Sequence, residues 1–232
     1  TDWENVCNNL HLENSKFFPL PVCLPVEKNK FKLGDKVTLL DNTNYPLATI
    51  KIEDLYNPDV EWECLKAYGT NDDNHPYVKY KMKHKNMQYI SGKLTKINDV
   101  RHYDFKEDRL SPNETKEYFK KNNWNTIVGF QTRNPMHKAH YELTKYALSK
   151  TEDENAKLLL NPVVGETQSV DIDYHTRVNV YKEMVKKYPE NTVKLCLLPL
   201  AMRMAGPREA CLHALIRKNY GCTHFVVGRD HA

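Results

Sequence analysis

The sequence predicts an α/β protein in which an open parallel sheet follows a β-rich region. From about residue 126 onward, short apolar runs alternate with longer stretches of helical periodicity, as in a parallel sheet whose strands are joined by helices. Several runs are apolar on both faces, which is typical of strands covered by helices on both sides. These runs are Leu158–Leu160, Val193–Leu198 and Phe225–Val227. The first part of the chain shows short strand candidates separated by turn residues instead.

Residues 1 to about 110 are expected to form mainly β-structure. Lys36–Leu40 and Ala48–Ile52 flank the turn-rich loop Asp41–Pro46 and together predict a hairpin. Phe17–Val26 contains three prolines, so we expect an edge strand or an extended connection there. The pattern then predicts a helical stretch and another strand, at Asp54–Ala67 and Tyr89–Leu94.

Lysines alternate strictly with other residues in Lys79–Lys85. Basic residues interleaved with aromatic ones are typical of a nucleic-acid-binding patch. The same alternation fits a strand that turns one lysine face to solvent, and a charged face also discourages edge-to-edge pairing. The formal net charge of +4 is small for a nucleic-acid-binding protein. We therefore favour the strand and expect no nucleic-acid partner.

Ser111-Pro112-Asn113-Glu114 predicts the start of a helix, with serine as N-cap, proline in the first position and glutamate completing a capping box. We expect this helix to reach about Asn122, and a domain boundary near residues 105–110 that divides the chain into 1–108 and 109–232. After it, the pattern predicts strands at 126–130, 157–164, 193–198 and 223–227 and helices at 136–150, 173–188 and 207–219.

A polar turn, Gln131–Asn134, stands between the first of these strands and the helix that follows it. Asparagine is a good N-cap and proline suits the first helical position, so Asn134-Pro135 predicts the helix start. Backbone N–H groups and the positive end of the helix dipole favour an anion at such a turn. His137 and His140 are three residues apart, on nearly the same helix face, where they could stabilise charge on a phosphoryl group. An apolar stripe is expected at Met136, Ala139, Leu143 and Ala147.

Polar clusters follow each predicted strand of the second domain. They are Gln131–Asn134, Gly165–Asp173, Ala201–Arg208 and Gly228–Ala232. In an open, Rossmann-like parallel sheet the ligand binds beyond the carboxyl ends of the strands, so these four clusters should converge on one site.

Several classes of protein are excluded by missing motifs. The chain has neither the P-loop pattern Gly-x-x-x-x-Gly-Lys-Ser/Thr nor Gly-x-Gly-x-x-Gly, and it has no His-Glu-x-x-His or Cys-x-x-Cys for zinc. Asp171 and Asp173 could ligate Mg²⁺, but we favour caps of the next helix, and we expect no protein-held metal. The six cysteines have no metal spacing and are expected to be reduced core thiols. No apolar stretch approaches the ~18 residues of a membrane span.

Three blocks of sequence resemble the ATP sulfurylase family, in the same order along the chain. They are Gln131–His140, Leu198–Ala210 and Gly228–Ala232. The resemblance implies a PUA-like β-barrel followed by a Rossmann-like nucleotidyltransferase domain. It also implies that sulfate attacks the α-phosphate of ATP directly, giving adenosine 5′-phosphosulfate and pyrophosphate, with Mg²⁺ carried by the nucleotide.

The resemblance assigns roles to particular residues. It implies that Thr132, Arg133 and Asn134 are catalytic and that His137 and His140 stabilise the transition state. Contacts with ATP are implied for Gln131, Thr132, Arg133, Asn134, Gly228, Arg229, Asp230 and His231. Contacts with sulfate are implied for Arg133 and for the backbone of Ala232.

The sequence leaves alternatives for the function of the protein and for the role of two arginines. Another H-x-x-H adenylyltransferase and a non-catalytic RNA-binding PUA-like protein are the alternatives to a sulfate adenylyltransferase. Arg203 and Arg208 either close over the substrates as a flap or are solvated beside a helix that starts at Pro207. We expect a homo-oligomer. We expect it to be located in the cytoplasm, with an organelle as the alternative location. We also expect the protein to continue beyond Ala232, because the last βα unit has no closing helix.

Overall fold

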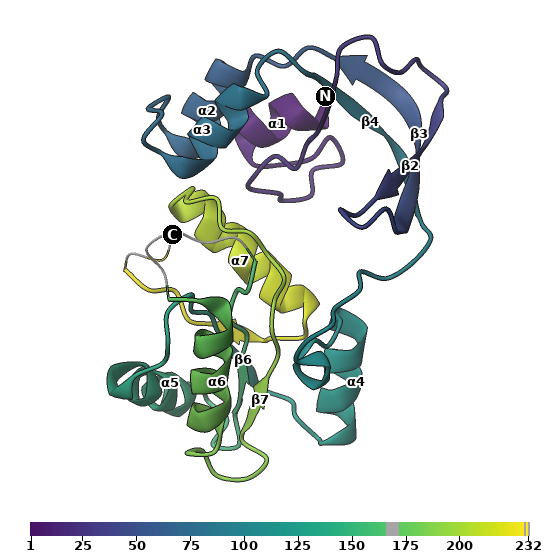
Figure 1. The fold of residues 1–232 in the computed structure, drawn as a ribbon. Helices are drawn as coiled ribbons and strands as arrows, with labels where there is room; N and C mark the ends of the chain where they lie inside the picture. The colour runs from purple at the N-terminus through teal and green to yellow at the C-terminus, as the bar shows by residue number, and fades with distance from the viewer. Residues whose placement is uncertain (166–171, 230, 232) are drawn as a thin grey trace. The chain divides into compact units, whose positions relative to one another are not determined.

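The computed structural model describes residues 1–165, 172–229 and 231 (Figure 1). The chain divides into two compact units. Unit 1 comprises Thr1–Arg101 together with Met204–Glu209, and unit 2 comprises His102–Arg203 and Ala210–Ala232.

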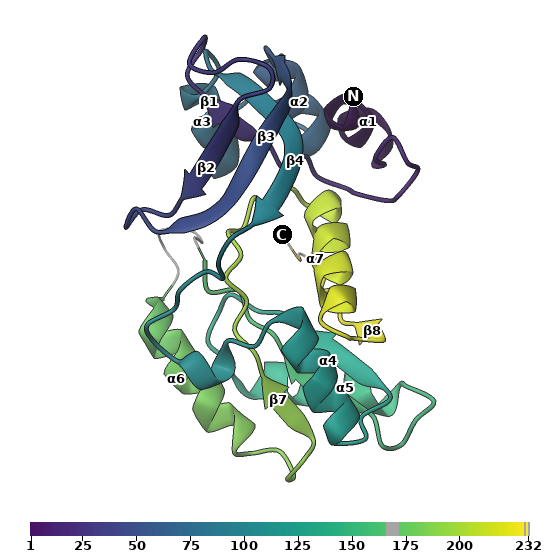
Figure 2. The same ribbon diagram turned by 90° about the vertical axis from the view of Figure 1, so that its right-hand side faces the viewer.

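Unit 1 is built on a four-stranded antiparallel sheet with the strand order β1-β4-β3-β2. Figure 2 shows β2, β3 and β4 side by side in this sheet. The strands are β1 (Leu24–Val26), β2 (Lys36–Leu40), β3 (Pro46–Tyr56) and β4 (Gln88–Lys96), and the helices are α1 (Asp2–Asn9), α2 (Val60–Tyr68) and α3 (Pro76–Lys83). The predicted hairpin is confirmed as β2–β3, and the proline-containing segment supplies the edge strand β1. The predicted helical stretch from Asp54 begins only at Val60, because β3 continues to Tyr56.

The predicted lysine-faced strand at Lys79–Lys85 is wrong, because this segment lies mostly in helix α3. His75 caps the helix by accepting from the Val78 N–H, and Pro76 occupies its first turn. Val78 and Met82, four residues apart, pack with Val60 and Cys64 of α2 in one apolar cluster. The helical spacing of these apolar residues therefore outweighs the two-residue alternation of the lysines.

One of those lysines, Lys81, is buried against the fully buried carboxylate of Glu63, with Nζ and Oε1 2.5 Å apart. The Tyr89 hydroxyl and the Trp3 indole N–H donate to the other oxygen of Glu63, at 2.9 and 3.1 Å. These four side chains come from α1, α2, α3 and β4. The buried charge pair therefore links three helices and the sheet of unit 1.

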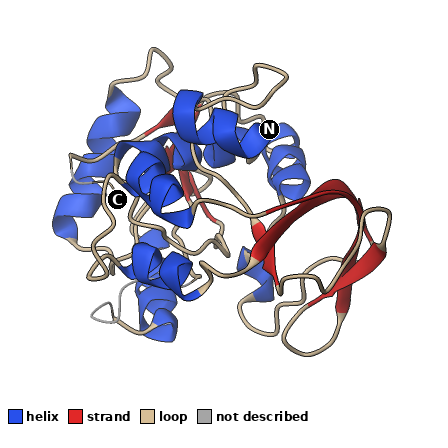
Figure 3. Cartoon of the chain, turned by 90° about the horizontal axis from the view of Figure 1, so that it is seen from above, coloured by secondary structure: helices blue, strands red, loops and turns tan. Residues whose placement is uncertain are grey.

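Unit 2 is built on a parallel sheet with the strand order β7-β6-β5-β8. Its strands are β5 (Ile127–Phe130), β6 (Lys157–Leu160), β7 (Val193–Leu195) and β8 (His224–Phe225). Its helices are α4 (Pro112–Lys121), α5 (Lys138–Ser149), α6 (Tyr174–Val185) and α7 (Pro207–Asn219), preceded by a 3₁₀ turn, η1 (Lys106–Asp108). Figure 3 draws all helices of the chain in blue and all strands in red. The predicted parallel α/β sheet is confirmed, although β6, β7 and β8 are shorter than expected.

Both faces of this sheet are covered. Phe130, Leu158 and Leu160 pack against Val178 and Tyr181 of α6 in one apolar core. On the other face, a Cβ added to Gly129 would lie 2.9 Å from the Cys222 sulfur and 3.2 Å from Cγ of Arg217 in α7. Side chains alternate across a strand, so Gly129 lets α7 approach β5 closely.

Two predicted helix caps of unit 2 are confirmed. Ser111 and Glu114 form the predicted capping box of α4. Asp173 caps α6 by accepting from the Thr176 N–H at 3.0 Å, which supports the cap interpretation over a metal ligand, while Asp171 lies outside the described residues. The expectation of core thiols holds for the buried Cys7, Cys64, Cys196 and Cys222 but not for Cys23, which is half-buried, or Cys211, which is exposed. Among the described residues, no helix combines the length and the apolar character needed to cross a membrane.

We predict that Lys81→Met lowers the free energy of unfolding by about 3–5 kcal/mol, because it leaves the Glu63 carboxylate buried without its cation. Removing both charges with Glu63→Gln and Lys81→Met should recover most of that loss. Lys79→Met, on the exposed side of the same helix, is the matched control and should change stability by less than about 0.5 kcal/mol. Urea unfolding would measure all three variants, and equal effects of the two lysine substitutions would contradict the prediction.

Candidate functional site

The strand order of unit 2 reverses direction between β5 and β8. Across the sheet from one edge to the other, the strands are the third, second, first and fourth of unit 2 in chain order. This is the arrangement of half of a doubly wound sheet. Ligands of such sheets bind outside the carboxyl ends of the strands at this reversal. Gln131–Asn134 follows β5, and Gly228 and Arg229, the start of the predicted Gly228–Ala232 cluster, follow β8, so these segments flank the reversal.

The Gln131–Asn134 turn is closed by its own threonine. The buried Thr132 hydroxyl accepts from the Asn134 N–H and also contacts the Asn134 carbonyl, both at 3.0 Å. Gln131 is half-buried, with its amide nitrogen 3.9 Å from the sulfur of Met202. Arg133 is half-buried and Asn134 is exposed. The turn is therefore fixed internally while polar side chains remain accessible.

The helix start predicted at Asn134-Pro135 is wrong. Helix α5 begins at Lys138, and His137 is its N-cap, with Nδ1 accepting from the Ala139 N–H at 3.2 Å. Tyr181 holds the Asn134 carbonyl at 2.9 Å, and Met136 is buried in the core, so residues 134–136 are kept out of the helix. The predicted apolar stripe is also wrong, because Leu143 is 41% exposed and the buried residue of α5 is Thr144.

The two histidines nevertheless lie together. Their ring centroids are 4.0 Å apart with the planes 29° from parallel. His137 is exposed, whereas His140 is half-buried with Phe130 5.8 Å away between ring centroids. Burial lowers the pKa of His140 below its usual 6.5, the nearby His137 lowers it further, and the Pro135 carbonyl acts in the opposite direction. The neutral imidazole form of His140 is therefore favoured.

Two residues that the sequence did not single out contact the turn. Arg177 and Tyr181 of α6 bind the carbonyl oxygens of Arg133 and Asn134. An arginine inside an otherwise amphipathic helix gives no sequence signal that its partner is a backbone carbonyl 44 residues away. Such contacts depend on how the helix packs on the sheet.

The other predicted loops are only partly described. A Cβ added to Gly165 would lie 2.4 Å from the Leu200 carbonyl oxygen, so the loops after β6 and β7 approach closely. Gly228 and Arg229 are exposed, and His231 is half-buried with Nε2 3.0 Å from Nδ1 of His213. Asp230, Ala232 and most of the Gly165–Asp173 loop lie outside the described residues.

Helix α7 begins at Pro207 as predicted, and Arg208 lies in its first turn. The Arg208 side chain is half-buried. It donates to backbone carbonyls within unit 1, those of Val6, Cys7 and Pro19, at 3.2, 2.9 and 3.4 Å.

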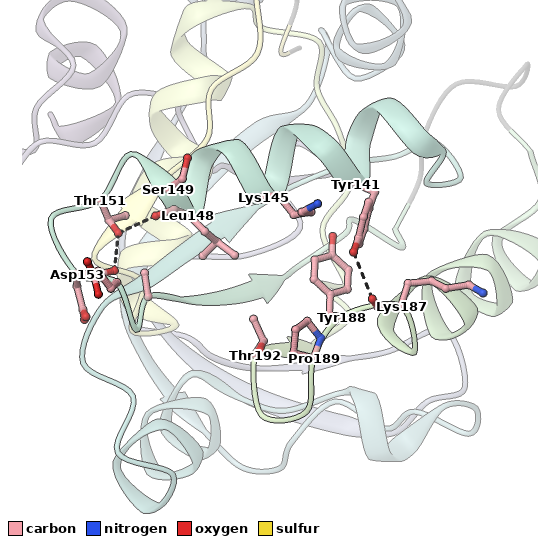
Figure 4. A pocket seen from close by; sticks show the side chains of 12 residues that line it. Tyr141, Lys145, Leu148, Ser149, Thr151, Asp153, Lys187, Tyr188, Pro189 and Thr192 are labelled. Atoms are coloured by element: carbon pink, nitrogen blue, oxygen red, sulfur yellow. Dashed lines mark hydrogen bonds between the residues drawn. The ribbon is translucent and has the colours of Figure 1, made fainter.

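An open pocket of about 920 Å³ lies at the opposite end of the sheet. Figure 4 shows Tyr141 and Lys145 of α5 on one side of it and Lys187, Tyr188, Pro189 and Thr192 on the other. Its other lining residues, Thr151, Asp153, Glu154 and Ala156 among them, precede β6, so the pocket faces the amino ends of the strands. It is therefore separate from the candidate site. Among the described residues, no group of three or more histidine, cysteine, aspartate or glutamate side chains is placed to hold a metal ion.

The fold and the polar loops define a Rossmann-like α/β domain that follows an antiparallel β-domain. A family model described as ATP-sulfurylase matches residues 106–232, and one described as PUA-like domain matches residues 1–99. The chain belongs to the ATP-sulfurylase family. This confirms the resemblance inferred from the three sequence blocks.

Curated relatives agree with this assignment. A sulfate adenylyltransferase of Schizosaccharomyces pombe is 48% identical over all of this chain and 48% of its own length. One of Eremothecium gossypii is 46% identical, over all of this chain and 46% of its own length. The chain therefore spans about half the length of the curated relatives it matches.

A solved structure supports the fold independently. A hexameric APS kinase from Thiobacillus denitrificans is similar over 99% of this chain and 41% of its own, with a TM-score of 0.78 and 24% sequence identity. At this identity the likeness shows the fold alone.

We predict that His140 titrates below pH 6.5, because burial and the neighbouring His137 both disfavour its imidazolium form. Replacing His137 with asparagine keeps a good N-cap but removes the neighbouring imidazole, so the pKa of His140 should rise toward its usual value. A pH titration of the imidazole NMR signals would measure both effects. A His140 pKa above 6.5, or one unmoved by the substitution, would contradict the prediction.

Proposed function

We propose that the protein is a sulfate adenylyltransferase. A sulfate oxygen attacks the α-phosphorus of ATP in line, the bond from that phosphorus to the α–β bridging oxygen breaks, and pyrophosphate leaves as adenosine 5′-phosphosulfate forms. The reaction is reversible. The observation that carries the proposal is the self-closed Gln131–Asn134 turn with its adjacent histidine pair at the strand-order reversal. Membership of the ATP-sulfurylase family supports it.

Under this proposal the turn binds the phosphates. Gln131, Thr132, Arg133 and Asn134 contact ATP, and Arg133 also binds sulfate, since a planar guanidinium can donate two parallel hydrogen bonds to a tetrahedral oxyanion. Thr132, Arg133 and Asn134 are the catalytic residues of the turn. Because this transfer needs no covalent enzyme intermediate, catalysis rests on positioning and on donors that face the developing charge.

The histidine pair supplies such donors. His137 and His140 stabilise charge as it develops on the phosphoryl group and on the departing pyrophosphate. The lowered pKa of His140 favours its neutral form, which contributes as an N–H donor. The half-buried ring beside Phe130 is partly shielded from water, which strengthens its hydrogen bonds to an anion.

The loop after β8 completes the proposed site. Gly228, Arg229, Asp230 and His231 bind the adenosine side of ATP, and the backbone of Ala232 contacts sulfate. Mg²⁺ enters with the ATP phosphates rather than on a protein site, and it neutralises phosphate charge when bound. We also propose a domain boundary between residues 108 and 109, a homo-oligomeric assembly and a cytoplasmic location.

The alternative functions have less support. The RNA-binding alternative relied on an alternating lysine face, and Lys81 of that segment is buried against Glu63. The other alternative, an H-x-x-H adenylyltransferase with an organic phosphate acceptor, is distinguished by the acceptor it requires.

We predict that the intact protein releases pyrophosphate from Mg-ATP only when sulfate is present. His137→Asn, which retains an N-cap, should lower kcat by about 10²–10³-fold, the usual cost of one lost transition-state donor. A coupled phosphate assay would measure both. Release that is independent of sulfate, or unaffected by the substitution, would contradict the proposal.

We also predict that Arg133→Lys raises the KM for sulfate by at least about tenfold, because a lysine ammonium cannot reproduce a bidentate guanidinium contact. Lys145→Ala, at the far end of α5 beside the pocket of Figure 4, is the matched control and should leave that KM unchanged. Steady-state kinetics with varied sulfate would measure the KM of both variants. An unchanged KM in the Arg133 variant would remove Arg133 from the sulfate site.

A further inference from the structure

We propose that Arg177 is a positioning residue that, together with Tyr181, fixes the backbone of the Gln131–Asn134 turn so that its carbonyl oxygens are withdrawn from the anion it binds. The inference rests on the proposed function. It assigns helix α6, which carries none of the residues proposed to touch substrate, a role in binding ATP.

Three successive carbonyl groups of the turn are each held by a donor. The Thr132 carbonyl accepts from the Val163 N–H at 3.2 Å. The Arg133 carbonyl accepts from Nη1 of Arg177 at 2.8 Å, and the Asn134 carbonyl from the Tyr181 hydroxyl at 2.9 Å. Arg177 and Tyr181 are four residues apart, so they lie on one face of α6. The same Nη1 also donates to the Val163 carbonyl at 3.2 Å and joins the turn to the extension of β6.

This arrangement matters because carbonyl oxygens are the negative ends of the peptide dipoles. A carbonyl free to rotate toward the ligand would repel a phosphate. With all three oxygens bound, the turn can present donors to an anion without reorganising when the anion arrives.

The burial of Arg177 is a second reason to assign this residue a role in binding an anion. The residue is 2% exposed, and among the described residues no carboxylate forms an ion pair with it. Its Nε is also buried without a hydrogen-bond partner. Burying a cation without a counter-charge destabilises the folded protein, so stability by itself does not account for an arginine here. Placed directly behind the turn, its positive charge favours a polyanion on the other side.

The test compares two buried tyrosines of the same apolar core. Tyr181→Phe removes the donor to the Asn134 carbonyl, whereas Tyr188→Phe removes a hydroxyl that contacts Thr144 at 2.6 Å, remote from the turn. We expect both variants of the intact protein to lower Tm by similar amounts. Only Tyr181→Phe should raise the Kd for Mg-ATP in calorimetric titration, by at least threefold.

Arg177 is tested by two substitutions. Arg177→Met should raise the Kd for Mg-ATP at least tenfold, and Arg177→Lys, which keeps the charge and one donor, should recover part of that loss. Amide hydrogen exchange of a peptide spanning residues 130–136 should be faster in Arg177→Met and Tyr181→Phe than in Tyr188→Phe. If Arg177→Met does not fold, Tyr181→Phe decides the question.

The outcomes separate this inference from the proposed function. Folded variants with unchanged Kd and unchanged exchange of residues 130–136 would overturn the inference while the unmodified protein remained an active sulfate adenylyltransferase. Equal changes in the Tyr181 and Tyr188 variants would also overturn it, because they would indicate a general loss of packing. An unmodified protein that binds no ATP would overturn the proposed function. In that case, faster exchange confined to the Arg177 and Tyr181 variants would still support the ordering of the turn by α6.

Discussion

The structure of unit 2 depends on how backbone groups are satisfied where the parallel strands end, since a buried polar group without a partner is costly. Asn161, which follows β6 and is fully buried, supplies hydrogen-bond partners for several of these backbone groups. Its N–H donates to the Phe130 carbonyl of β5, and its side-chain amide donates to the Cys196 carbonyl just after β7, at 2.9 and 2.6 Å. Its own carbonyl accepts from Arg217 of α7 at 2.8 Å. Three strand ends and one helix are thereby held in a single hydrogen-bonded group, beside the candidate site.

Two arginines act in the same way at this edge of the sheet. Arg177 donates to carbonyls of the Gln131–Asn134 turn, and Arg217 donates to Asn161. Burial lowers the pKa of Arg217 to about 10, so it keeps its charge at neutral pH. The strand ends are thus held by cations that bond to backbone carbonyls, which makes this edge favourable to anions before any exposed side chain is counted.

The sequence predicted the features that depend on local pattern or on strand topology. The parallel sheet, the capping box of Ser111 and the position of the Gln131–Asn134 turn at the end of β5 all follow from periodicity and from the rule for strand ends. Features that depend on tertiary contacts were missed. Lys81 belongs to a helix because Val78 and Met82 find an apolar cluster on α2, and α5 starts late because Tyr181 and the core hold residues 134–136. Neither partner is visible in the local sequence of the segment it controls.

Unit 1 is assembled from segments that are distant in the chain. Met204–Glu209 belongs to it, and Arg208 donates to carbonyls of Val6, Cys7 and Pro19, while the Met204 carbonyl contacts His75 at 2.9 Å. During synthesis, the first hundred residues therefore emerge from the ribosome well before the donor that completes their packing. The N-terminal segment must wait for most of unit 2 to be translated. A fragment cut after β4 would leave those carbonyls without their arginine, so the last step in forming unit 1 is tied to the completion of its neighbour.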